Sequence, residues 1–197
     1  MSFDALTSVA VGIGIAAACG FRVFVPLLIV SAAALSGHLT LEPGFEWIGS
    51  IPALVAFATA TLLEVLAYKV PWLDHALDML ATPAAAVAGV VASASVVTDL
   101  PPLLRWSVVL IGGGLAAGTV QGMTVLVRLK SGLTTGGIAN PLVASGELAG
   151  AVVTSVLALT IPLVALAIVA AACIGLLYWF ISFPGGRIDR PPGRGPG

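Results

Sequence analysis

Six long apolar segments are the feature that most constrains what this chain can fold into. They span roughly residues 6–35, 47–70, 83–98, 103–128, 147–161 and 163–183. A bilayer core about 30 Å thick takes about 20 helical residues. Charged residues make up only 9% of the chain, too few to cover a surface that faces water. The sequence therefore predicts an all-α, polytopic transmembrane helix bundle over residues 1–183, in a single domain surrounded by lipid.

The segments differ in how well their lengths fit one crossing. The segment 83–98 is short and begins at Pro83, a residue that favours the first position of a helix. Just before it, residues 72–80 form an amphipathic stretch that we interpret as an interfacial helix. The last two segments are one apolar stretch interrupted by Pro162. A hairpin at this proline and one long kinked helix are both compatible with the sequence.

The placement of basic residues favours six crossings over five. With the N-terminus in the cytoplasm, Lys69, Arg128, Lys130 and the arginines of the tail face the cytoplasm, and the acidic 36–46 loop lies opposite. We therefore expect a multi-pass protein of the cell (inner) membrane with both termini cytoplasmic. The Pro- and Gly-rich tail, 184–197, is predicted to be disordered. The net charge of −1 and the lack of a basic patch argue against nucleic-acid binding.

Small residues recur at four-residue spacing in the first and fourth segments. Such stripes let helices approach closely, and they comprise Gly12, Ala16 and Gly20, then Gly114, Gly118 and Gly122. Each stripe opens a block of three segments, so the halves 6–98 and 103–183 are candidates for an inverted repeat, as in many transporters. The alternative is generic helix packing. Either use of these faces would also allow a homodimer.

Arg22 is the residue that points most directly to a function. It lies midway along the first apolar segment, where a charge is costly unless it is paired or hydrated. Pro26 would clash with the carbonyl of Arg22 in an unbroken helix, so the first helix is predicted to be broken close to Arg22. We expect either a buried ion pair, with Glu64 as the favoured partner, or contact with an anion.

Other polar residues at membrane depth complete a candidate binding site. Glu64, Gln121, Asn140 and Glu147 each lie in or beside an apolar segment. The uncharged 131–147 stretch is compatible with a re-entrant segment that feeds a cavity. It is equally compatible with a plain loop in which Ser145 caps the helix that bears Glu147.

The sequence contains none of the usual signatures of catalysis or metal binding. Metalloprotease, nucleophile-elbow and phosphate-loop motifs are absent, and Cys19 and Cys173 lie separately in apolar runs. We therefore expect no enzyme activity, no cofactor and no metal site.

Several short motifs together resemble a bacterial family of small polytopic membrane proteins known only as a domain of unknown function. They are Gly20-Phe21-Arg22 with Pro26, Glu64 to Pro71 with Asp74, Gly136-Gly137, Asn140-Pro141 and Glu147. The resemblance covers roughly residues 8–183. It supports a membrane protein and the choice of polar residues, and it implies no substrate.

Two functions are compatible with these observations. The first is a transporter or channel-like protein for a small solute or ion, with Arg22, Glu64, Gln121, Asn140 and Glu147 lining its site. The second is a membrane scaffold or accessory subunit that binds partner helices through its small-residue faces.

Overall fold

In the computed structural model, residues 3–67, 71–98 and 100–182 are described, and residues 71–79 by their backbone alone. The fold is all-α, with no strand in these ranges. The elements are α1 (Phe3–Cys19), α2 (Phe24–Leu35), the 3₁₀ turn η1 (Glu46–Gly49), α3 (Ile51–Ala67), α4 (Pro71–Val96), α5 (Pro102–Ser107), the π-helical turn η2 (Val108–Gly113), α6 (Gly114–Thr135), α7 (Asn140–Thr160) and α8 (Pro162–Ser182). The predicted tail, with its arginines, and Lys69 lie outside the described residues.

Three helical stretches are long and apolar enough to cross a bilayer. They are Pro102–Thr135, Asn140–Thr160 and Pro162–Trp179. The outward surface is apolar as well, with the side chains of Leu63, Leu115 and Ile174 each more than 60% exposed. Soluble proteins rarely expose large continuous apolar patches. These features indicate a membrane protein.

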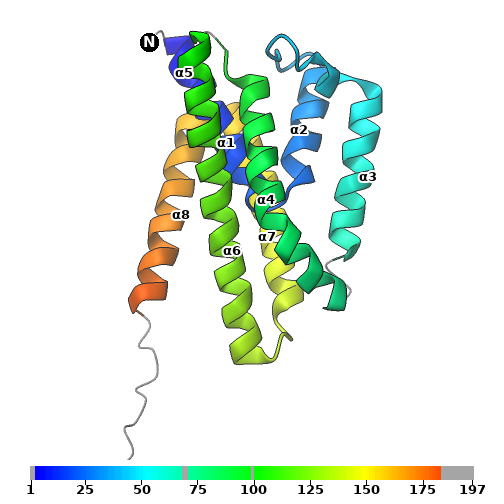
Figure 1. Ribbon diagram of the computed structural model, residues 1–197, viewed down its shortest axis with the longest axis vertical. Helices are drawn as coiled ribbons and strands as arrows, with labels where there is room; N and C mark the ends of the chain where they lie inside the picture. Colours follow the sequence, from blue (N-terminus) through cyan, green and yellow to red (C-terminus); the bar gives the residue numbers. More distant parts are fainter. Residues whose placement is uncertain (1–2, 68–70, 99, 183–197) are drawn as a thin grey trace, which may run out of the picture.

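The helices run along the length of one bundle, except that α1 and α2 form a hairpin (Figure 1). α1 descends from the N-terminal end of the bundle to about half its height, and α2 returns to the same end. Two hydrogen bonds confirm this path. Ser8 in α1 donates to the carbonyl of Thr98, and the backbone N–H of Glu42, after α2, donates to the carbonyl of Ser95. Both acceptors lie at the end of α4.

α1 is the central helix of the bundle because its small residues let four helices pack around it. It contacts α4, α6, α7 and α8. Ala16, Ala17 and Ala18 are fully buried. A Cβ added to Gly20 would lie 2.6 Å from the Cβ of Val120. The first small-residue stripe thus serves close packing inside the protein.

The second small-residue stripe does not serve close packing inside the protein. An added Cβ at Gly114 would make only an ordinary contact with Val90, and at Gly118 and Gly122 it would meet nothing within 4 Å. The two stripes therefore have different surroundings. The elements that open the two halves, α1 and α6, also run in the same direction, whereas an inverted repeat requires opposite directions (Figure 1). The structure does not confirm the inverted repeat.

Three sequence interpretations need correction. Pro83 lies inside α4 instead of beginning a helix, so residues 72–80 continue into the same helix and are not a separate interfacial one. The first half of α4 leans toward α3 (Figure 1), as expected for a helix with an internal proline. The 131–147 stretch is neither a re-entrant segment nor a long loop, because α6 ends at Thr135 and α7 begins at Asn140.

The interruption at Pro162 is a hairpin. α7 ends at Thr160 and α8 begins at Pro162, where a missing N–H costs nothing because the first turn has no intrahelical acceptor. The two helices then run in opposite directions (Figure 1). As a result, the N-terminus and the end of α8 lie at opposite ends of the bundle. This arrangement does not fit the expectation that both termini share one side of the membrane.

Candidate functional site

The break between α1 and α2 places polar backbone groups in the middle of an apolar bundle. α1 ends at Cys19, and the N–H groups of Gly20 and Phe21 donate to carbonyls of its last turn. Pro26 lies in the first turn of α2, where its ring no longer meets a preceding helical turn. The predicted broken helix is confirmed, and the new N-terminus of α2 carries N–H groups that need acceptors.

Glu64 supplies these acceptors from α3. Its Oε1 accepts from the N–H of Val23 at 2.9 Å, and its Oε2 accepts from the N–H of Phe24 at 3.3 Å. A carboxylate at a helix N-terminus is stabilised both by these bonds and by the helix dipole. Glu64 therefore holds the broken helix in place, instead of forming the expected ion pair with Arg22.

Arg22 points to α7. Its side chain is 2% exposed, and its Nη2 lies 3.5 Å from Oε2 of Glu147. The same nitrogen donates to the carbonyl of Ala144 at 2.9 Å. A buried ion pair of Arg22 is thus present, with Glu147 as the carboxylate.

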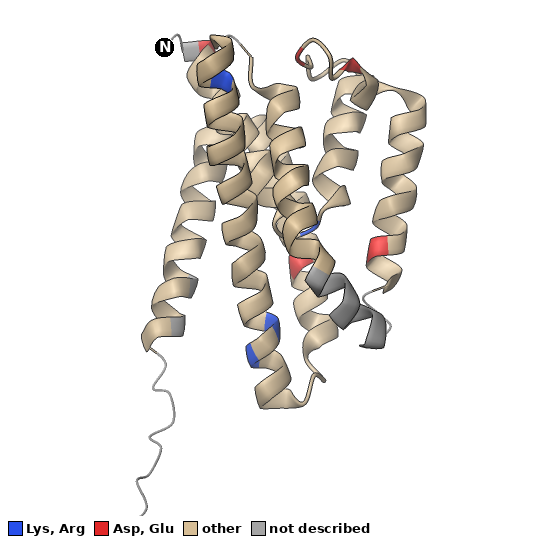
Figure 2. Ribbon diagram, in the orientation of Figure 1, with Lys and Arg blue, Asp and Glu red and all other residues tan. Residues whose placement is uncertain are grey.

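Glu147 is also held by a second arginine. Nε of Arg128 donates to Oε1 of Glu147 at 2.7 Å, and Nη2 of Arg128 donates to Oε2. Both side chains are at most 7% exposed. Such a two-pronged contact fixes both partners. We call Arg22, Glu64, Arg128 and Glu147 the charged cluster. Figure 2 shows that few other charges lie between the ends of the bundle in the part of the chain that the structure describes.

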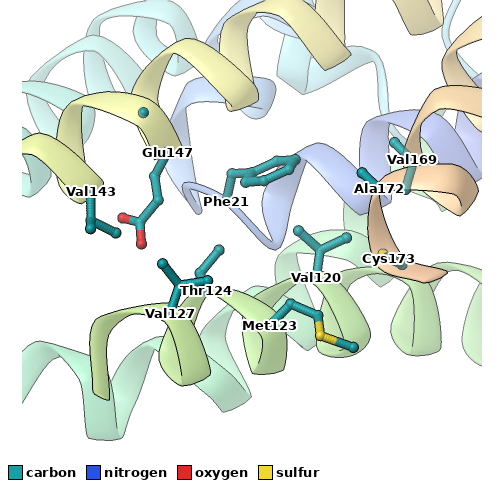
Figure 3. A pocket seen from close by; sticks show the side chains of 11 residues that line it. Phe21, Val120, Met123, Thr124, Val127, Val143, Glu147, Val169, Ala172 and Cys173 are labelled. Carbon is teal, nitrogen blue, oxygen red and sulfur yellow. The ribbon is translucent and has the colours of Figure 1, made fainter. Parts of the chain in front are cut away.

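Two cavities lie on either side of the helix break. The first, of about 270 Å³, lies among α6, α7 and α8 below Phe21 (Figure 3). Its lining residues are Phe21, Val120, Met123, Thr124, Val127, Val143, Gly146, Glu147, Val169, Ala172 and Cys173. Apart from the Glu147 carboxylate and the Thr124 hydroxyl, its side chains are apolar.

The second cavity, of about 420 Å³, lies among α2, α3 and α4. Its described lining comprises Val23, Phe24, Ala60, Leu63, Glu64, Ala67, Leu80, Ala81 and Ala84. Phe21 thus faces the first cavity, and Val23 and Phe24 face the second. Arg22 stands between them, and each cavity is lined by one carboxylate of the charged cluster.

Comparison with known proteins assigns the chain to a family. The family described as "Domain of unknown function (DUF4126)" matches residues 9–182. The chain belongs to the DUF4126 family. The resemblance seen in the sequence motifs is therefore confirmed, and the match includes all four residues of the charged cluster. No curated protein and no solved structure matches the chain.

Two residues predicted for the site lie apart from the charged cluster in this DUF4126 chain. Gln121 is buried on α6, where its backbone packs against Gly20. Asn140 is the first residue of α7, about 10 Å along the helix from Glu147. Its Oδ1 is buried without a hydrogen-bond partner among the described residues. Ser145 donates to the carbonyl of Pro141 and caps nothing, which corrects the capping expectation.

Arg128 was not predicted for the site, because the charge pattern placed it with Lys130 on the cytoplasmic side. The signal was its spacing from two other polar residues. Gln121, Thr124 and Arg128 are spaced three and then four residues apart, so they share one face of α6. All three are buried. A polar stripe within an apolar helix predicts an inward face, and following it would have extended the site to Arg128.

No group of three or more His, Cys, Asp or Glu side chains that could hold a metal lies within residues 4–67, 80–98 and 100–182. The chemistry that the site offers is that of guanidinium and carboxylate groups beside two apolar cavities.

Proposed function

We propose that this protein is a small membrane transporter or channel-like protein that moves a small solute or ion past the charged cluster. The observation that carries the proposal is the position of Arg22 on a broken helix between two cavities. Non-helical backbone at membrane depth is tolerated where protein or a cavity receives it. Ionisable residues at that depth commonly mark the pathways of ions and substrates.

The proposed mechanism is an exchange of partners around Arg22. Glu147 contacts Arg22 from the first cavity, and Glu64 caps the next two residues from the second. A ligand that engages Glu147 or Glu64 weakens the contact between that carboxylate and the segment 20–23. This short segment between two helices can then shift toward the other carboxylate. Such a step would expose the cluster to one cavity at a time. It involves no chemical conversion of the solute.

The proposal includes an orientation in the cell (inner) membrane. Lys130 lies near the end of α6 that connects to α7, whereas the loop with Glu42 and Glu46 lies at the other end of the bundle. The positive-inside rule then places the α6–α7 connection and the end of α8 in the cytoplasm. The N-terminus faces the opposite side.

Flux measurements on proteoliposomes test the proposal. Purified wild type and Arg22→Ala are compared for uptake of inorganic cations, inorganic anions, amino acids and apolar organic ions. Arg105→Ala is the matched control, because Arg105 pairs with Glu42 away from the cluster. We expect flux with wild type and Arg105→Ala, and a loss of flux with Arg22→Ala. Wild-type flux no greater than in empty liposomes, or full activity of a folded Arg22→Ala, overturns the proposal.

A second candidate function rests on the outer face of α6. Gly118 and Gly122 have open space around them, which suits the close approach of another helix. A scaffold or accessory subunit would use this face. Gly118→Leu would then abolish association with the partner and leave flux unchanged, whereas Arg22→Ala would leave association intact.

A further inference from the structure

We infer that the second cavity binds a monovalent organic cation with an apolar body, and that Glu64 is its counter-ion. The inference rests on the proposed function, because it names the substrate class that would enter from this side of the helix break. Three features of the molecule support it: the position of the cavity, the chemistry of its lining, and the hydrogen bonds that hold Glu64.

The cavity is large enough for an organic molecule. Its volume of about 420 Å³ lies in the range of ligand sites, about 300–1,000 Å³. It extends from the break, at Val23 and Phe24, to Leu80 on α4. A ligand in this space lies directly beside the segment that carries Arg22.

The lining selects the class of ligand. Among the described lining residues, Glu64 is the one polar side chain, and the remainder are Val, Phe, Ala and Leu. A metal cation such as Ca²⁺ needs six to eight oxygen ligands, and the described lining offers one carboxylate. An anion would be repelled by the carboxylate. A neutral apolar molecule would displace water from the acceptor positions of the carboxylate that the two backbone N–H groups do not occupy, and would offer no donor or charge in return.

A cation with an apolar body satisfies both parts of the cavity. Its apolar surface is buried against the alanine and leucine side chains. Its charge interacts with Glu64 in a medium of low polarity, where the attraction between opposite charges is stronger than in water.

Glu64 is held ready for such a ligand. Each carboxylate oxygen accepts one backbone N–H from α2, and a carboxylate offers about four acceptor positions. The two bonds fix the side chain and leave it half of its acceptor capacity. Its side chain is neither fully buried nor fully exposed, so the carboxylate borders the cavity without being sealed behind other residues.

Equilibrium binding of radiolabelled tetraphenylphosphonium to the purified protein in detergent tests the inference. Tetraphenylborate, which has the same shape and the opposite charge, is the control ligand. We expect Glu64→Gln to weaken phosphonium binding about tenfold or more, because the counter-charge is lost. Ala60→Phe fills the cavity and should weaken it similarly. Ala58→Phe, on the exposed face of α3, should leave it unchanged.

The inference is overturned if the phosphonium binds Glu64→Gln as tightly as wild type, or if tetraphenylborate binds wild type equally well. If Glu64→Gln does not fold, Ala60→Phe and the two ligands decide the question. Flux assays separate this inference from the proposed function. Phosphonium binding without transport of any solute supports the cation site and contradicts the proposed transport function. Arg22-dependent flux of another solute without phosphonium binding supports transport and contradicts the cation site.

Discussion

Replacing Glu147 with Gln should destabilise the protein more than any other conservative change of a charged residue. The substitution keeps the size of the side chain and removes one negative charge. It leaves the guanidinium groups of Arg22 and Arg128 beside a neutral amide. Both arginines are at most 7% exposed, so water cannot replace the lost carboxylate.

The expected magnitude follows from the geometry. Nε of Arg128 lies 2.7 Å from one oxygen of Glu147, and Nη2 of Arg22 lies 3.5 Å from the other. Two unit charges 4 Å apart attract by about 4 kcal/mol at an effective dielectric constant of about 20. Removing one member of a buried pair typically costs about 3–5 kcal/mol. We therefore expect Glu147→Gln to lower the free energy of unfolding by about 3–5 kcal/mol.

Reversible unfolding in mixed micelles, followed by circular dichroism, measures this loss. Glu46→Gln is the matched control, because it is the same substitution at an exposed position. It should alter the free energy of unfolding by less than about 0.5 kcal/mol. A double variant, Arg128→Leu with Glu147→Leu, should be more stable than Glu147→Leu alone, because it removes one of the two buried arginines that Glu147→Leu leaves beside no carboxylate.

Equal stability of Glu147→Gln and wild type would refute the reasoning. It would mean that the two arginines are hydrated or compensated from elsewhere. Additive losses in the double variant would likewise contradict a direct pair.

Three further predictions concern packing, the N-terminal end of the bundle and topology. Gly20→Ala should lose about 1–3 kcal/mol in the same unfolding assay, because its Cβ would lie 2.6 Å from that of Val120, whereas Gly118→Ala should be neutral or slightly stabilising. Arg105→Ala should lose about 1–3 kcal/mol, because it removes hydrogen bonds of 3.0 and 2.7 Å to two carbonyls at the end of α4; unchanged stability would contradict it. In a cysteine-free background, an impermeant maleimide should label cysteines at positions 4 and 36 from one side of the membrane and at 134 from the other, and labelling of all three from one side would contradict the fold.

Much of the fold could be predicted because hydrophobicity and proline act locally. The apolar segments predicted the all-α bundle, and Pro26 predicted the broken helix close to Arg22. The interruption at Pro162 was also predicted from the sequence. Only the packing of the helices distinguishes a hairpin there from one long kinked helix. α7 and α8 fold back on each other because α7 starts at Asn140 and so gains a full crossing length.

The partners within the charged cluster could not be predicted in the same way. If each apolar segment crosses the membrane once, Arg22 and Glu64 lie at similar depths, which made Glu64 the expected partner of Arg22. The hairpin of α1 and α2 changes the position of Arg22 relative to the other helices. Once α2 turns back, its first N–H groups need an acceptor, and Glu64 meets that need. Glu147 then becomes the carboxylate for Arg22. Its place depends on α7 starting seven residues earlier than the apolar pattern indicates.

The charge pattern could not distinguish a chain that begins with the α1–α2 hairpin from one that begins with a single crossing. These two topologies differ in the side on which the N-terminus lies. A hairpin of α1 and α2 starts and ends at the same end of the bundle, whereas one continuous crossing would start at the other end. Every connection after residue 36 keeps its side in both cases, so the basic residues at the α6–α7 connection obey the positive-inside rule either way. The chain before Arg22 contains no Lys or Arg and a single acidic residue, Asp4. The side of the N-terminus therefore depends on the backbone break at Arg22, and on no charge that precedes it.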